Sequence, residues 1–151
     1  MRLSVVICTY NRVKWIGKAL ESCLHFDMPK SDYEVLVINN NCNDGTTELV
    51  DSFIDSHPEL NISHIMETSQ GLSYARNRGF AEAKSEIITY IDDDAVPHPD
   101  LLTKIADYMD AHPNVIGLGG KVTPIYEGSE PKWLNDYLNM MVTRINYGEK
   151  P

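Results

Sequence analysis

Three consecutive carboxylates, Asp92, Asp93 and Asp94, directly follow a short apolar run at residues 86–91. Adjacent carboxylates raise one another's pKa unless a positive charge lies nearby. A bound Mg²⁺ or Mn²⁺ would relieve this repulsion, because both are hard cations that prefer oxygen ligands. The alternative is a solvated acidic turn ahead of a helix, where aspartate is a common N-terminal cap. This acid triplet therefore predicts either a metal site or a capping turn.

Two further apolar runs, at residues 3–9 (LSVVICT) and 33–38 (YEVLVI), also end at polar residues. Short runs rich in β-branched residues are typical of buried parallel strands, and we expect residues 86–91 to form one as well. The polar residues that end the two runs are Thr9, Tyr10, Asn11 and Arg12 in the first case and Asn39, Asn40 and Asn41 in the second.

Helices are predicted between these strands, because apolar residues recur there at helical spacing. The third helix is expected to have an apolar face of Leu72, Ala75, Gly79, Phe80 and Ala83, and the fourth helix to begin at Pro97. A weaker strand is expected at residues 61–66, a glycine-containing strand at 115–123 and a short amphipathic helix at 131–145. Strands and helices that alternate in this way predict an α/β fold with a mostly parallel sheet flanked by helices.

In such sheets ligands bind outside the carboxyl ends of the strands, where the strand order reverses. The three polar strand ends therefore favour a binding site over a capping turn. An aromatic ring at Tyr10 suits a nucleobase, carboxylates suit ribose hydroxyls and a metal, and a metal with an arginine suits a diphosphate. Arg76 either reaches this ligand or forms a surface salt bridge. Neither GxGxxG after the first strand nor GxxxxGK[ST] occurs, which argues against a dinucleotide site or a P-loop.

The composition limits the partners and the compartment. The 151 residues suggest one domain, and the net charge of −9 argues against nucleic acid as a partner. Three cysteines without a CxxC motif suggest a reduced, intracellular chain. No segment is long enough to span a membrane, so we expect a cytoplasmic location and leave open an association with the inner face of the membrane.

Four segments resemble the motifs of family 2 glycosyltransferases, which are inverting enzymes with the Rossmann-like GT-A fold. They are residues 5–12 (VVICTYNR), 37–46 (VINNNCNDGT), 70–79 (QGLSYARNRG) and 92–97 (DDDAVP). The segments occur in the family's order and follow the expected strands. The resemblance covers essentially the whole chain and is most specific in residues 3–102.

The resemblance implies roles for the residues of these segments. Tyr10 would lie against the base, and Asp92 and Asp93 would contact the ribose or support the metal. Asp94, with Asp92, would bind Mg²⁺ or Mn²⁺, which bridges the donor diphosphate and acts as a Lewis acid. The residues implied in nucleotide binding are Thr9, Tyr10, Asn11, Arg12, Asn39, Asn41, Arg76, Asp92 and Asp93.

The implied reaction is metal-dependent transfer of a sugar, with inversion, from a nucleoside diphosphate sugar to a hydroxyl group. A UDP-sugar is the favoured donor, and a carbohydrate or a lipid-linked molecule is the expected acceptor. Asn39 stands where the family often has an aspartate that contacts the base, which leaves the base open. The alternatives are a nucleotide-sugar-binding fragment that does not catalyse and, less favoured, a nucleotidyltransferase, whose glycine- and lysine-rich loop is missing.

No motif after Thr123 marks a catalytic base, and Glu127, Glu130 and Asp136 are carboxylates without a distinguishing context. We therefore expect residues 1–151 to be the amino-terminal part of a longer, truncated GT-A domain. Residues 1–123 would form its nucleotide-binding core and residues 124–151 the start of the acceptor side. Residues 131–145 are also a candidate contact for a homodimer.

Overall fold

The computed structural model describes residues 1–134 and 138, and these fall into two compact units. The first unit is Met1–His112, and the second begins at Pro113. The first unit contains the helices and strands that position the candidate site. No helix in the described part of the chain is long and apolar enough to cross a membrane.

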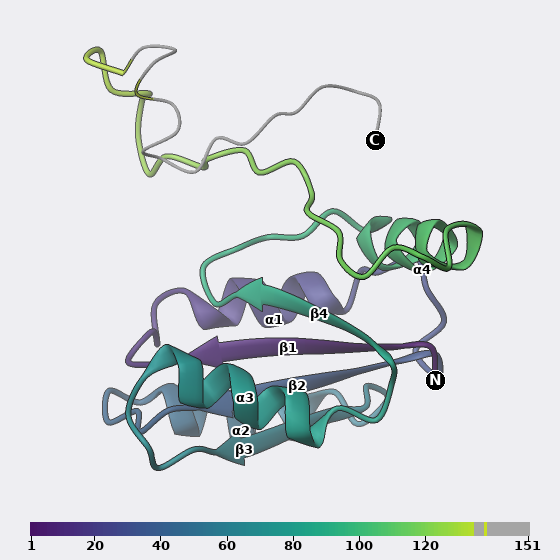
Figure 1. Ribbon diagram of the computed structural model, residues 1–151. Coiled ribbons are helices and arrows are strands. Elements are labelled where there is room, and N and C mark those ends of the chain that lie inside the picture. The colour runs from purple at the N-terminus through teal and green to yellow at the C-terminus, as the bar shows by residue number, and fades with distance from the viewer. Residues whose placement is uncertain (135–137, 139–151) are drawn as a thin grey trace. The chain divides into compact units, whose positions relative to one another are not determined.

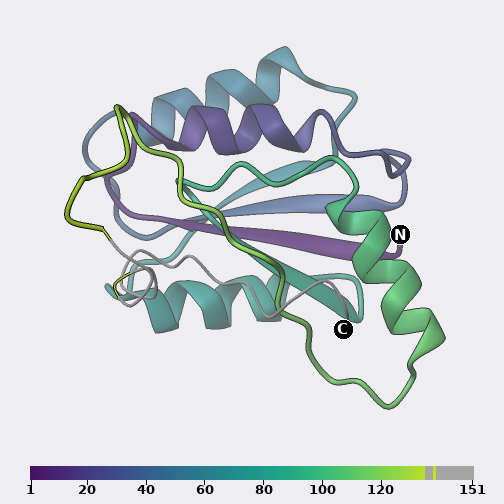
Figure 2. The same ribbon diagram turned by 90° about the horizontal axis from the view of Figure 1, so that it is seen from above.

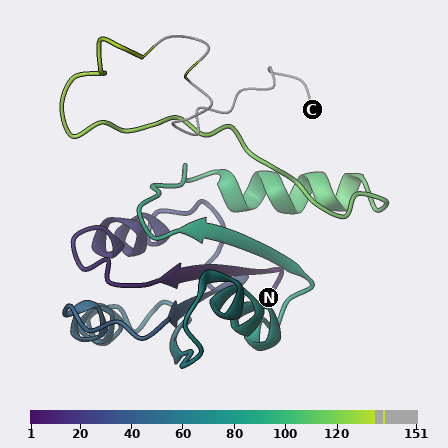
Figure 3. The same cartoon turned by 60° about the vertical axis from the view of Figure 1, so that its left-hand side comes forward.

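The first unit is built on a parallel sheet of four strands in the order β3-β2-β1-β4 (Figure 1). The strands are β1 (Leu3–Thr9), β2 (Tyr33–Asn39), β3 (Ile62–Met66) and β4 (Ile87–Asp92). The arrows of β1 and β4 point the same way in Figure 3. This arrangement confirms the predicted α/β fold class.

Helices cover both faces of the sheet (Figure 2). The helices are α1 (Ile16–Cys23), α2 (Thr46–Ser56), α3 (Leu72–Glu82) and α4 (Leu101–Ala111). Buried residues of α1, α2 and α4 pack in one cluster with Val5 and Ile7 of β1, whereas Ala75 of α3 packs with Val6 on the opposite face. Because β1 is covered on both sides, it needs apolar residues at successive positions.

The approach of α3 to the sheet depends on small residues. A β-carbon at Gly79 would lie 2.4 Å from Cγ1 of Val6, so only glycine fits there without a shift. The predicted apolar face of α3 is therefore partly wrong. Ala75 and Gly79 are buried, but Leu72 and Phe80 are 54% and 67% exposed.

Two further features of the first unit differ from the prediction. The strand before the acid triplet is half-buried rather than buried, because β4 is an outer strand of the sheet. Helix α4 begins at Leu101 rather than at Pro97. Proline disfavours the helical conformation of the residue before it, so Pro99 keeps His98 out of the helix.

The strand expected at residues 115–123 is not formed. Residues 113–134 form turns, bends and irregular segments with an isolated β-bridge at Val122. Gly117, Gly119 and Gly120 provide no side chain that could pack, and Ile116 is fully exposed, so this segment has no buried face. Most of the helix expected at 131–145 lies outside the described residues.

Candidate functional site

A cleft of about 480 Å³ lies at the carboxyl ends of β1 and β4. The chain runs from β1 outward through β2 to β3 and then returns to the other side of β1 as β4, so the cleft lies where the strand order reverses. Register brings Cys8 beside Asp92 and Thr9 beside Asn39. The residues that line the cleft are Cys8, Thr9, Tyr10, Arg12, Asn40, Gln70, Gly71, Leu72, Ala75, Asp92, Asp93 and Asp94.

The loop that follows β1 is held by the loop that follows β2. The backbone N–H of Asn43 donates to Oδ1 of Asn11 at 2.8 Å, and the N–H of Arg12 donates to Oγ1 of Thr46 at 3.2 Å. Asn11 has a φ of +54°, which asparagine tolerates better than most residues. These bonds present Tyr10 and Arg12 to the cleft, whereas the Asn11 side chain serves the loop and does not line the cleft.

Asn40 holds the opposite wall of the cleft. Its buried side chain donates from Nδ2 to the carbonyl oxygens of Glu67 and Ser69, at 2.9 and 2.7 Å. Its Oδ1 accepts from the N–H of Gly71 at 2.7 Å. The segment before α3 is thereby fixed, and Gly71 and Leu72 become part of the wall. The place of Asn40 in a run of three asparagines is the only local signal for this role in the sequence.

The three members of the acid triplet have different surroundings. Asp93 is buried, and its Oδ1 lies 3.8 Å from Nε of Arg12. Burial raises the pKa of Asp93, the Thr9 hydroxyl and Arg12 oppose this rise, and Asp94 and Asp92 add to it. The Thr9 hydroxyl is itself buried and forms no well-aligned hydrogen bond to any described residue. Asp92 and Asp94 are exposed at the cleft.

The exposed carboxylates fit a hard divalent cation. No group of three histidine, cysteine or acidic side chains in residues 1–134 could hold a metal alone. Mg²⁺ typically takes only one or two protein carboxylates and fills its remaining positions with phosphate oxygens and water. Asp92 and Asp94 offer this number of carboxylates, and Arg12 leaves both free because it pairs with Asp93. The donor set thus suits a cation that arrives with a phosphate ligand.

Three other predicted nucleotide-binding residues do not line the cleft. Asn39 is fully buried, and Asn41 donates from Nδ2 to the carbonyl oxygen of Thr68 at 2.8 Å. Arg76 is exposed on α3. Burial raises the pKa of Cys8 to about 11, and the charge of Arg76 opposes this rise.

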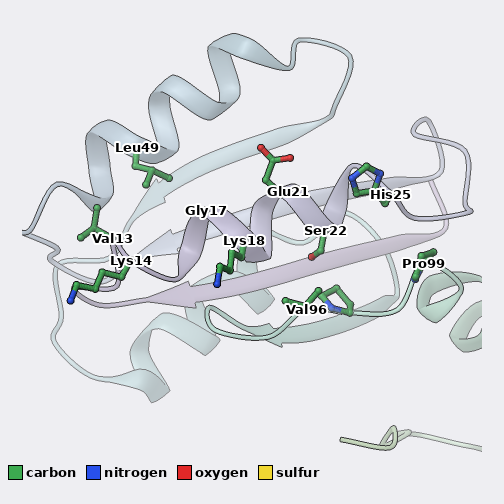
Figure 4. Close-up of a pocket in the computed structure, with 11 residues that line it drawn as sticks. Val13, Lys14, Gly17, Lys18, Glu21, Ser22, His25, Leu49, Val96 and Pro99 are labelled. Atoms are coloured by element: carbon green, nitrogen blue, oxygen red, sulfur yellow. The ribbon is translucent and has the colours of Figure 1, made fainter. Parts of the chain in front are cut away.

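A larger cavity, of about 760 Å³, lies beside α1 and is drawn in Figure 4. Its walls are mainly aliphatic, with Val13 and Leu49 on one side and Val96 and Pro97 from the segment that follows the acid triplet. Glu21 is the carboxylate among its lining residues. This cavity lacks the paired acids and amides of the smaller cleft, so its chemistry does not suit a metal-bound diphosphate.

Known proteins resemble the chain in sequence and in structure. It is 36% identical over 102 residues to Glycosyltransferase AglE of Haloferax volcanii, a match that covers 68% of this chain and 33% of AglE. The mannosyltransferase PcManGT of Pyrobaculum calidifontis, solved with GDP-Man and Mn²⁺, superposes with a TM-score of 0.68 at 30% identity, over 72% of this chain and 32% of that one.

TarS of S. aureus (residues 1–349), solved with UDP-GlcNAc, gives a TM-score of 0.69 at 26% identity, over 83% of this chain and 37% of that one. The chain thus spans about a third of each of these three chains. The sequence model described as Glycosyl transferase family 2 matches residues 4–150. Because this match extends over nearly all 151 residues, the chain belongs to glycosyl transferase family 2.

Proposed function

We propose that this chain binds the nucleotide-sugar donor of a glycosyltransferase that transfers the sugar to an acceptor hydroxyl group. The observation that supports this proposal is the grouping of Thr9, Tyr10 and Arg12 with the acid triplet in one cleft. The nucleotide would be uridine diphosphate, with guanosine diphosphate as the competing choice. Solved relatives carry UDP-GlcNAc and GDP-Man.

Different residues of the cleft would bind the base, the ribose and the phosphates of the donor. Tyr10 is 51% exposed beside the cleft and offers a ring face on which a base can stack. Asp93 and the Thr9 hydroxyl suit ribose hydroxyls, because a carboxylate accepts and a hydroxyl both donates and accepts. Arg12 suits a phosphate oxygen, since guanidinium groups form charge-assisted hydrogen bonds with phosphate. Asn39 and Asn41, which are buried or bound in loops, would act by shaping these walls.

Asp94 and Asp92 would hold Mg²⁺ or Mn²⁺. When bound, this ion would supply positive charge to the departing diphosphate as a Lewis acid. Mn²⁺ is present in the solved mannosyltransferase that resembles this chain. Arg12, fixed by its N–H bond to Thr46, would add a second positive charge on the donor side of the cleft.

Inversion requires a base that deprotonates the acceptor on the face opposite the diphosphate. The acid triplet supplies the only carboxylates that line the described cleft, and it is assigned to the donor. We therefore assign the base, and the site for a carbohydrate or lipid-linked acceptor, to another part of the protein. The same observation keeps a nucleotide-sugar-binding role without catalysis as the second candidate function.

Calorimetry with UDP and GDP, in Mn²⁺ and in EDTA, tests the proposal on this chain. We expect UDP to bind in Mn²⁺ and Asp94→Ala to remove the gain in affinity that Mn²⁺ provides. Asp107→Ala is the matched control, because it removes the same charge from an exposed position on α4. If Asp94→Ala binds UDP in Mn²⁺ as well as the wild type does, the metal assignment is wrong. If neither nucleotide binds, the proposed function is wrong.

A further inference from the structure

A hydrogen-bonded chain of side chains lies behind the cleft, at the far side of β2. His64 of β3 is almost buried, and its Nδ1 lies 2.7 Å from Oδ1 of Asp51 on α2. Its Nε2 lies 3.1 Å from Nδ2 of Asn39. Asn39 is fully buried at the end of β2, so the chain runs from an exposed carboxylate to the base of the cleft loops.

The partners of Asn39 fix the orientation of its amide. The backbone N–H of Cys42 donates to Oδ1 at 2.9 Å, which identifies that atom as the oxygen. Nδ2 therefore faces the two other partners, and it donates to Oγ1 of Thr47 at 2.8 Å and to Nε2 of His64. Both amide hydrogens and the amide oxygen are used, and a flipped amide would lose the bond from the Cys42 N–H, because two hydrogen-bond donors would then face one another.

The same contacts fix the proton of His64. A carboxylate only accepts, so Nδ1 must carry the hydrogen that Asp51 receives. The amide nitrogen of Asn39 only donates, so Nε2 must be unprotonated. His64 is thereby held as the neutral Nδ1–H tautomer. A ring hydrogen on Nε2 would face a hydrogen of the Asn39 amide, and one of the two groups would have to move.

Asn39 connects this arrangement to the cleft through Cys42. The Cys42 thiol accepts from the N–H of Asn11 at 3.2 Å and lies 3.6 Å from the carbonyl oxygen of Thr9. Asn11 begins the turn that presents Arg12 to the cleft. If the Asn39 amide rotated, the backbone N–H of Cys42 would lose its acceptor. The Cys42 thiol, which contacts Asn11 and Thr9, would then no longer be held in place beside the wall that contains Thr9 and Arg12.

We propose that His64 and Asp51 are positioning residues for nucleotide binding, which hold the Asn39 amide in the one orientation that supports the Thr9–Arg12 wall of the cleft. This proposal rests on the proposed function, because its readout is nucleotide affinity. It gives Asn39 an indirect role, in contrast to the direct contact with the base that the sequence resemblance implies.

The test uses UDP affinity in Mn²⁺ and exploits the exposed position of Asp51, where substitutions leave the core intact. Asp51→Ala leaves Nδ1 without its acceptor, so we expect UDP to bind about three- to tenfold more weakly. Asp51→Asn retains an acceptor oxygen, and we expect near wild-type affinity. Asp55→Ala, one turn along the same exposed face of α2, is the matched control for charge and is expected to bind as the wild type does.

A ¹⁵N spectrum of the His64 ring provides a second readout, which a purely structural role would not change. The wild type should show an unprotonated Nε2 at neutral pH. Asn39→Asp replaces the donor that faces Nε2 with an acceptor, so the ring should then carry hydrogens on both nitrogens at the same pH. Amide spectra and thermal unfolding of each variant identify any that fail to fold.

The outcomes separate the two proposals. If wild-type protein binds neither UDP nor GDP, the proposed function and this inference both fall. If it binds UDP and Asp51→Ala binds equally well, the inference alone is overturned. Equal losses in Asp51→Asn and Asp51→Ala would also overturn it, because charge rather than the hydrogen bond would then be responsible. A protonated Nε2 in the wild type contradicts the assigned tautomer and overturns it as well.

Discussion

Replacing Gly79 with alanine tests how closely α3 approaches the sheet. The added β-carbon would lie 2.4 Å from Cγ1 of Val6 and 3.3 Å from its Cγ2, whereas carbon atoms pack at about 3.5 to 4.0 Å. Val6 is fully buried, and its β-branched side chain is stiff, so α3 or β1 must shift. Such overpacking costs about 1 to 3 kcal/mol. Alanine returns about 1 kcal/mol through helix propensity, which leaves a net loss of about 0 to 2 kcal/mol.

Gly17→Ala is the matched control, because the β-carbon there meets nothing closer than Cδ1 of Leu49 at 4.0 Å. Both variants change glycine to alanine in a helix, so the difference between them isolates the overpacking cost. Urea unfolding followed by circular dichroism should show Gly79→Ala to be less stable than Gly17→Ala by about 1 to 3 kcal/mol. In a Val6→Ala background the cost should shrink, as neighbouring sites couple. Equal stability of the two variants, with no coupling to Val6, would refute the close contact.

Three other perturbations address the cleft. Burial raises the pKa of Asp93, so the stabilisation by this group is present at low pH and is lost as pH rises through the pKa of the folded state. Urea unfolding with EDTA should therefore show that Asp93→Asn gains stability relative to the wild type from pH 4 to pH 7. A relative loss of stability over this range would contradict the raised pKa. Asn40→Ala leaves three part-buried backbone partners without the side chain that binds them, and it should cost about 1 to 3 kcal/mol and weaken UDP binding. Unchanged unfolding and affinity would show that water replaces the side chain. Burial raises the pKa of Cys8 from 9.0 to about 11, so iodoacetamide at pH 8 should alkylate this thiol about a hundredfold more slowly than it alkylates free cysteine. A rapid reaction would show that the Cys8 thiol is exposed.

The sequence predicts most of what topology alone dictates. The run LSVVICT is buried on both faces as β1, so its apolar residues identify it without any periodic pattern. Parallel strands share one carboxyl edge, which is why Tyr10, Arg12 and Asp94, far apart in sequence, could be expected in one place. That expectation needed only the order of strands and helices, and the observed cleft contains all three residues.

The remaining features depend on packing and register, which local patterns do not encode. A prediction from apolar periodicity favours large residues for the buried face of a helix. Helix α3 instead contacts the sheet through Ala75 and Gly79, because it lies so close to β1 that a larger side chain does not fit between them. No motif in the sequence marks His64 as part of a site. Its partnership with Asn39 follows from the register of β3 on β2 and the position of α2, neither of which the sequence shows directly.

The central place of β1 has a consequence for the synthesis of the chain. β1 is made before the other three strands of this sheet, yet one of its two neighbours is β4, which begins 84 residues later (residue 87 against residue 3). At about 5 to 20 residues per second, translation leaves one edge of this largely apolar strand without its partner for about 4 to 17 s. Ribosome-associated chaperones have that interval in which to shield it. A nascent chain that acquires affinity for UDP would report the arrival of β4, because the acid triplet completes the cleft.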